Sequence, residues 1–175
     1  MTAFDQAWEV AKMPLVRDSI KVRLPDSTGF PTANAIFQDP DNPDNEYPIR
    51  AYEDQGGTRM VLGSNDDVMG EAYFNTGHQR YGEAMDDTTT GQINTFSGNE
   101  RKGVATAMYD LINEMGKMKG VRLKTRAGNL SSYSAPLWAK VLGLPYEGND
   151  QISAHTKFQR DNREPLYWPE KGVYE

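Results

Sequence analysis

The chain has 175 residues, of which 37% are hydrophobic and 25% are charged, a composition typical of one globular domain. It contains no cysteine, which excludes disulfides, thiolate nucleophiles and cysteine-bound metals, and no apolar run reaches the roughly 18 residues that a membrane span requires. Because the N-terminus has no basic region followed by an apolar stretch, we expect no signal peptide and a cytoplasmic protein.

The net charge of −6 is unevenly distributed along the chain. Residues 39–87 carry twelve acidic side chains against three basic ones, a balance of −9, whereas residues 100–175 carry twelve basic against nine acidic, a balance of +3. This division disfavours nucleic acid as a partner, and it favours an anionic ligand for the second segment. Acidic loops that only keep the protein soluble are the alternative explanation of the asymmetry.

Turn residues and alternating apolar residues predict the elements of the first half. An amphipathic helix is predicted over residues 4–13, because apolar residues recur on one side of it and Pro14 follows. Beyond it, apolar and polar residues alternate between turn sequences, as in an antiparallel meander. The predicted strands are 20–24, 49–53, 58–62, 68–74, 79–85 and 92–96, with an exposed loop at 39–45.

The second half begins with a helix. Val104, Met108, Leu111, Ile112 and Met115 recur at helical spacing and predict an amphipathic helix that starts after Gly103. A strand over 121–125, a helix over 134–142, and an edge strand or packed extended arm over 165–169 are predicted to follow. The order predicts one α+β domain, and we expect the tryptophans in it to anchor the packing.

The strand over 92–96 leads into a turn of small residues that opens this helix. The first amides of a helix have no partner within it and lie at the positive end of its dipole, so they attract phosphate oxygens. The sequence therefore predicts a phosphate-bearing ligand beside Gly103.

This order of elements resembles the GNAT acyl-CoA N-acyltransferase superfamily, particularly its small phage-encoded members. The superfamily's central motif is Arg or Gln, two residues, Gly, one residue, and then Gly or Ala; Gly103 and Ala105 match it, and Glu100 departs from it. The block from Leu130 to Gly143 is similar to the late helix of the family. In many members that helix carries the tyrosine that protonates the leaving CoA thiolate, and Trp138 occupies that place here.

The resemblance covers residues 68–143 and implies a mixed, mostly antiparallel sheet flanked by helices, with a β-α-β acyl-CoA-binding core. It divides the single domain into 1–67 (N-terminal helix, strands and acidic loop), the 68–143 core and a 144–175 C-terminal arm. The implied cofactor is acetyl-CoA or another acyl-CoA. Its implied binding residues are Ile93, Asn94, Thr95, Arg101, Lys102, Gly103, Val104, Ala105, Thr106, Asn129 and Ser131.

On this resemblance, the backbone of Ile93–Thr95 pairs with the pantetheine arm, an amide near Thr95 polarises the acyl carbonyl, and the amides of 101–106 hold the pyrophosphate. Glu71 and Glu83 are candidate bases, and both are also explained as exposed strand residues. Tyr133 is the candidate acid in place of Trp138, or else a packing residue. Asn129 and Ser131 either contact the cofactor or shape the loop.

Two functions follow as hypotheses. The first is an N-acyltransferase that moves an acyl group, most simply acetyl, from CoA to an amine, and the acidic segment favours a cationic amine. The second is a catalytically inactive protein of the same fold that acts in phage structure, assembly or host interaction, with a protein partner and a virion or host-cell location. His78 and His155 belong to no metal-ligand spacing, so no metal is predicted, and neither nucleic acid nor membrane is an expected partner.

Overall fold

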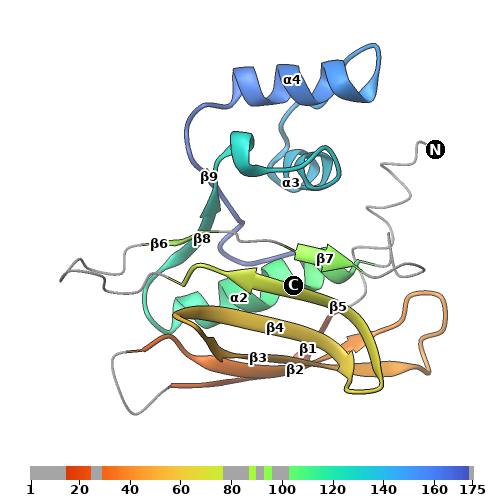
Figure 1. Cartoon of the computed structure of the whole chain (residues 1–175), viewed down its shortest axis with the longest axis vertical. Coiled ribbons are helices and arrows are strands. Elements are labelled where there is room, and N and C mark those ends of the chain that lie inside the picture. The colour runs from red at the N-terminus through yellow and green to blue at the C-terminus, as the bar shows by residue number, and fades with distance from the viewer. Residues whose placement is uncertain (1–14, 25–28, 77–86, 90–92, 96–102, 174–175) are drawn as a thin grey trace.

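The computed structural model describes residues 15–24, 29–76, 87–89, 93–95 and 103–173. In these residues the strands and helices form a six-stranded sheet, a three-stranded sheet and three α-helices, which confirms the predicted α+β class (Figure 1). In chain order the elements are β1 (Leu15–Arg23), β2 (Thr32–Gln38), β3 (Glu46–Asp54), β4 (Gly57–Ser64), β5 (Asp67–Phe74), β6 (Asp87–Thr89), β7 (Ile93–Thr95), α2 (Val104–Lys117), β8 (Arg122–Thr125), the 3-10 turn η1 (Ala127–Asn129), α3 (Ser134–Leu142), α4 (Gln151–Asp161) and β9 (Leu166–Tyr167).

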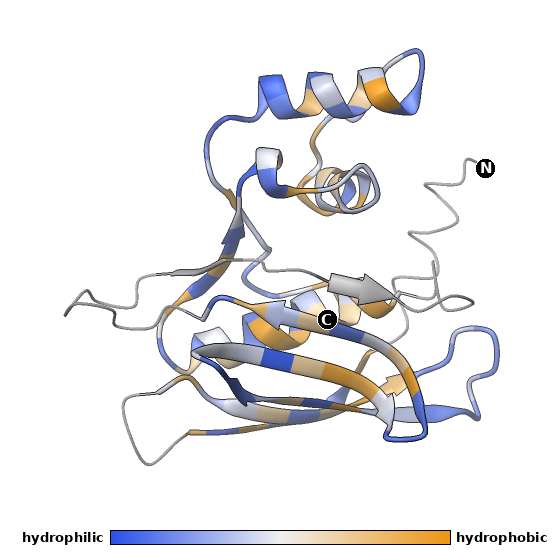
Figure 2. Ribbon diagram, viewed as in Figure 1, coloured by the Kyte–Doolittle hydropathy of each residue, from blue (hydrophilic) through white to orange (hydrophobic). Residues whose placement is uncertain are grey.

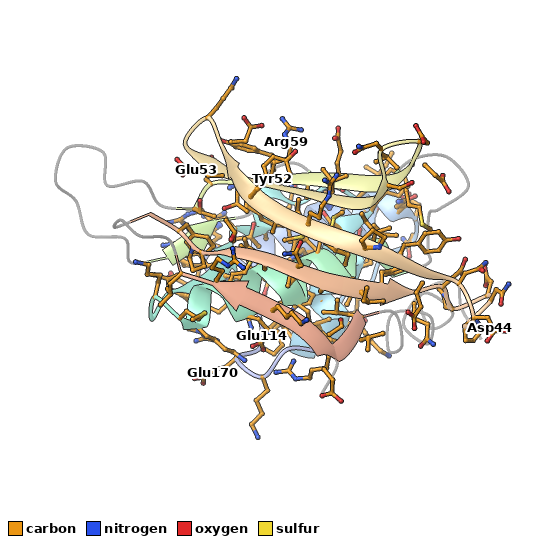
Figure 3. All side chains as sticks on the ribbon, turned by 90° about the horizontal axis from the view of Figure 1, so that it is seen from below. Asp44, Tyr52, Glu53, Arg59, Glu114 and Glu170 are labelled. Atoms are coloured by element: carbon orange, nitrogen blue, oxygen red, sulfur yellow. The ribbon has the colours of Figure 1, made fainter. Side chains whose placement is uncertain are left out.

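The larger sheet is antiparallel throughout, in the order β1-β2-β3-β4-β5-β7. Apolar residues at alternate positions of its strands are buried on one face; Phe37, Ile49, Leu62 and Phe74 have no exposed surface. The helices all lie on one side of this sheet (Figure 1). The other face carries polar and aromatic side chains, including Tyr52 and Arg59, and looks toward the viewer in Figure 3.

A bulge interrupts the edge strand β1. Val16 lies opposite Ile36 and Lys21 opposite Asn34, so the four residues between Val16 and Lys21 face only Ala35. The Ser19 hydroxyl compensates for the lost ladder bonds, because it accepts a hydrogen bond from the Ile36 N–H (2.8 Å) and donates one to the Val16 carbonyl (2.5 Å). The bulge ends regular pairing at this edge and directs Arg17 toward α2.

Helix α2 packs on the sheet with the stripe that its spacing predicts. Val104, Met108, Leu111, Ile112 and Met115 are each at most 2% exposed. The helix contacts β1, β2, β5 and β7 of the larger sheet and β8 of the smaller one. It therefore joins the two sheets.

The smaller sheet has the order β6-β8-β9, in which β6 runs parallel and β9 antiparallel to β8. Above it lie α3 and α4 (Figure 1). Helix α4 is hydrophilic over most of its surface (Figure 2), and Ala154 and Phe158 are its buried residues. No helix among the described residues has the length and apolar character to cross a membrane.

The predicted elements correspond to the observed ones with several differences. Strand β2 and helix α4 were not predicted, and β6 lies in residues whose Asp, Thr and Gly content predicted a turn. Strand β1 begins at Leu15, five residues before the predicted start. Residues 144–175 contain α4 as well as β9, so they form more than an extended arm. The loop over 39–45 is exposed from Asp41 onward, but Asp39 is buried, and its carboxylate accepts the Asp41 N–H at 2.9 Å. The predicted helix over 4–13 and strand over 79–85 lie outside the described residues.

Candidate functional site

The segment from Asp87 to Thr95 changes sheets. Its first part, β6, pairs in parallel with β8, with Thr88 opposite Leu123. Its second part, β7, pairs antiparallel with β5, with Thr95 opposite Gly70. No pairing joins β7 to β8 among the residues that the structure describes, so the predicted return strand lies beside β6 and diverges from β7. Among the described strands, β7 is therefore the last of the larger sheet, and one of its backbone edges faces no described neighbour.

Helix α2 begins at this point. Gly103 precedes it with φ 86° and ψ 11°, a left-handed conformation that glycine adopts without a steric penalty. The first bond of the helix from this residue runs from the Ala107 N–H to the Gly103 carbonyl (3.0 Å), so the amides of Val104, Ala105 and Thr106 precede the helical ladder. The side chains of Val104 and Thr106 are buried in the core. Backbone amides, rather than these side chains, are therefore the groups at the helix start that suit a ligand. Arg101, Lys102 and Glu100 lie outside the described residues.

The loop before α3 carries Asn129 and Ser131, the two other residues that the resemblance assigns to cofactor binding. Asn129 ends η1 and is exposed. Ser131 and Ser134 bond each other reciprocally: the Ser131 N–H donates to Ser134 Oγ (2.9 Å), and the Ser134 N–H donates to Ser131 Oγ (3.1 Å). This arrangement is a capping box, which satisfies backbone donors at the start of the helix. The Ser131 hydroxyl therefore shapes the loop. Asn129 and Ser131 are both exposed, and contact of either residue with a cofactor stays a prediction.

Tyr133 lies at the first turn of α3 and is 86% exposed. Its backbone N–H donates to Ser131 Oγ (3.3 Å), while its neighbour Ser132 accepts a hydrogen bond from the Gln151 side chain of α4 (3.3 Å). These contacts fix the backbone at this position and leave the phenol ring in solvent.

Glu71 lies on β5, between Val61 of β4 and Asn94 of β7 in the register of the sheet. Its neighbours along the strand, Gly70 and Ala72, are buried, so the Glu71 carboxylate belongs to the face opposite α2. There Arg59 Nη1 lies 3.6 Å from it. The structure thus places Glu71 and Tyr133 on different elements with no contact between them. Glu83 lies outside the described residues.

Trp138, at the position where the resemblance expects an acid, is fully buried in a cluster of four aromatic side chains. Its ring lies edge to face with Tyr109 (centroids 5.3 Å apart) and with Trp168 (4.9 Å), and Tyr109 in turn contacts Trp168 (4.9 Å) and Phe74 (6.3 Å). Both tryptophans anchor the packing, as predicted. Burial raises the pKa of Tyr109 to about 12, and the neighbouring Trp138 indole moderates the rise.

Two polar residues that the sequence analysis did not select lie under the end of the chain. Asp110 and Asn113 of α2 are 1% and 2% exposed. Asp110 accepts hydrogen bonds from residues 168 and 173, and Asn113 donates to the carbonyl of residue 169. They lie three residues apart, so they share one side of the helix. In the sequence, the signal for this buried contact was a pair of polar residues three positions apart in a helix whose other buried residues are mostly apolar.

A separate groove of about 440 Å³ lies at the other end of α2. Ile20 and Val22 of β1, Met118, and the charged side chains of Arg17, Glu114 and Lys117 line it. None of the predicted site residues lines it, and the sequence analysis did not anticipate it.

The described residues contain no group of three or more His, Asp or Glu side chains arranged to hold a metal ion. Comparison of the chain with protein-family models, with curated proteins and with solved structures finds no match in any of the three.

Proposed function

We propose that this protein binds an acyl-CoA where β7 and β8 diverge, and that it transfers the acyl group to an amine. The observation that carries the proposal is the change of sheets between β6 and β7, next to the glycine that opens α2. A strand with one unpartnered edge offers amide and carbonyl groups to an extended, amide-containing chain such as pantetheine. The helix start beside it offers amides to a pyrophosphate.

The proposed assignment uses backbone groups for most of the binding. The edge of Ile93–Thr95 pairs with pantetheine, the amides of Val104, Ala105 and Thr106 face the pyrophosphate, and Asn129 contacts the cofactor from the opposite side. In the transfer, a bond forms between the amine nitrogen and the acyl carbon while the carbon–sulfur bond breaks. The amine loses one proton and the thiolate gains one, so no further reactant is required.

An amine acceptor of positive charge suits the same end of the larger sheet. Thr95 lies opposite Gly70, near the start of β5, where Asp66 and Asp67 form the exposed turn from β4. The β2–β3 loop, with exposed Asp41 and Asp44, lies at this end as well (Figure 1). Attraction between these carboxylates and a cation weakens with added salt, so the proposal predicts a KM for a cationic amine that rises with ionic strength.

Titration calorimetry of the full chain with acetyl-CoA tests the cofactor assignment, and two glycine variants provide a matched pair. Gly103 and Gly143 both lie at a helix end with left-handed backbone (φ 86° and 69°), so replacing either by alanine imposes a similar strain of roughly 1 kcal/mol. We expect Gly103→Ala to weaken acetyl-CoA binding at least about tenfold and Gly143→Ala to leave it unchanged. The absence of heat with wild-type protein would refute the assignment.

A catalytically inactive protein of this fold, acting in phage assembly or host interaction, is the second candidate. Three observations favour it: Trp138 is buried, Glu71 is held beside Arg59 on the far face of the sheet, and Tyr133 points into solvent. Release of free CoA thiol in the presence of acetyl-CoA and a set of amines separates the two candidates. Binding without thiol release supports the second, and sustained release supports the first.

A further inference from the structure

Residues Leu166–Val173, which we name the C-terminal strap, cross from the smaller sheet onto α2. Leu166 and Tyr167 form β9 against β8, and the Trp168 N–H continues the ladder with a bond to the Leu123 carbonyl (2.9 Å). The chain then turns, with the Gly172 N–H bonded to the Pro169 carbonyl (2.9 Å) and Gly172 at φ 76°. The strap is thus tied at one end to β8 and at the other to the helix.

Helix α2 holds the strap with two polar side chains. Asp110 accepts the indole N–H of Trp168 at Oδ1 (2.6 Å), and its two oxygens both lie 2.9 Å from the Val173 N–H. Asn113 donates to the carbonyls of Pro169 (3.0 Å) and Glu170 (3.3 Å). These bonds fix the turn of the strap over one side of α2, and they orient the Trp168 ring.

The ring of Trp168 packs against side chains of both α2 and α3. It contacts Tyr109 of α2 and Trp138 of α3, each with a centroid separation of 4.9 Å, and it has no exposed surface. The amides at the start of α2 and the capped loop at the start of α3 are rigidly continuous with these helices. The two helices also touch directly, because the Tyr109 and Trp138 rings lie 5.3 Å apart. Trp168 completes this three-ring contact, so a side chain of the strap helps to fix α3 against α2.

We propose that Trp168 is a positioning residue for the acyl-CoA site: the strap braces α3 against α2 and so sets the position of the Asn129–Ser131 loop relative to Gly103. The role in ligand binding rests on the proposed function, whereas the role as a brace between the helices is independent of it. The ring acts through the two helices, because no strap residue lies in the Gly103 turn or in the loop before α3.

The test compares two full-length variants by hydrogen exchange and by acetyl-CoA titration. Trp168→Phe keeps an aromatic ring but loses the bond to Asp110 and part of the contact with Tyr109 and Trp138. Phe37→Leu is the control, because Phe37 is equally buried in the core but lies on β2, away from α3. Asp110→Asn is a second variant in case Trp168→Phe does not fold; it retains the volume but sets an NH₂ group against the Val173 N–H.

We expect Trp168→Phe to speed amide exchange in Ser131–Leu142 and in the strap, and to weaken acetyl-CoA binding by about fivefold or more. Phe37→Leu is expected to change neither quantity. Equal effects of the two variants on binding, or unchanged exchange in Ser131–Leu142 of Trp168→Phe, would overturn the proposal. If wild-type protein binds no acetyl-CoA, the proposed function fails alone, because the exchange comparison still decides whether Trp168 positions α3.

Discussion

Arg17 of β1 and Glu114 of α2, which are 97 residues apart in the chain, form a hydrogen-bonded ion pair of 2.7 Å. Lys117, one turn farther along α2, reaches the same Glu114 oxygen at 2.7 Å. Figure 3 shows Glu114 at the margin of the sheet, below the strands. The pair joins the bulged edge strand to the end of the helix, and the Glu114 side chain is only 19% exposed.

The charge on Glu114 makes the free energy of unfolding depend on pH in the acidic range. Burial alone would raise the pKa of Glu114, but hydrogen bonds from Lys117 and Arg17 outweigh it and lower the pKa below its ordinary 4.5. A carboxyl whose pKa is lower in the folded state stabilises the fold above its unfolded pKa, and this stabilisation is lost as pH falls through the folded pKa. Glu114→Gln should therefore be less stable than wild type at neutral pH by up to about 1 kcal/mol, and equally stable in strong acid.

Urea unfolding at several pH values measures this difference. Asp161→Asn is the control, because it removes an exposed ion pair with Lys157 on α4 and should change the neutral-pH midpoint little. Parallel loss of stability in wild type and Glu114→Gln below pH 4.5 would contradict the prediction.

Tyr109 should ionise well above the ordinary range of a tyrosine. Its pKa is raised from 10.0 to about 12 because burial disfavours the phenolate. The unfolded chain loses this proton at lower pH than the folded chain does, so the contribution of Tyr109 to stability is present below pH 10 and is lost as pH rises toward 12. Absorbance titration of phenolate should show one late step that is missing in Tyr109→Phe; an identical titration of both proteins would refute the assignment.

Ser131 should stabilise α3 as a helix cap. Ser131→Ala removes the acceptor of the Ser134 N–H and is expected to lower the free energy of unfolding by about 1 kcal/mol. Ser132→Ala is the neighbouring control, since the Ser132 side chain takes no part in the capping box, and Ser131→Thr should retain the cap. If Ser131→Thr keeps stability but weakens acetyl-CoA binding, Ser131 also contacts the cofactor.

Gly57 should tolerate no side chain. A Cβ atom at this position would lie 2.4 Å from the Tyr73 hydroxyl oxygen and 2.6 Å from the Phe74 carbonyl oxygen, so Gly57→Ala forces β4 and β5 apart. We expect a loss of about 1–3 kcal/mol in a thermal or urea melt. Gly128→Ala is the matched control, because an added Cβ there meets no atom within 4 Å. Equal stability of the two variants would show that β5 adjusts freely.

Elements with a regular apolar period could be predicted from the sequence, and those with few apolar residues could not. The stripe on α2 and the period of α3, whose observed bounds equal the predicted 134–142, are local signals. Helix α4 buries only Ala154 and Phe158, so its period is weak; its signal was Asp150, whose side chain caps the helix by accepting the Ser153 N–H (2.7 Å). Strand β2 was missed because alanine supplies two of its three buried residues.

In the candidate site, too, the sequence indicates local features but not the contacts between distant elements. The sequence indicates an unusual turn at Gly103, and the left-handed backbone there explains why glycine occupies it. The sequence does not indicate that the Ser131 hydroxyl is engaged in a helix cap or that Glu71 is held beside Arg59, because both partners depend on the register and direction of neighbouring elements. Glu83, Arg101 and Lys102 lie outside the described residues and stay predictions.

By itself, the sequence determined the α+β class, most strands of the meander, and helices α2 and α3, because periodicity and turn residues act over a few neighbouring positions. Only the tertiary structure decided that the strand before Gly103 leaves β8 for the larger sheet, and that Trp168 lies between α2 and α3 over Asp110. Those contacts join residues up to 58 positions apart, and their geometry follows from how the whole core packs.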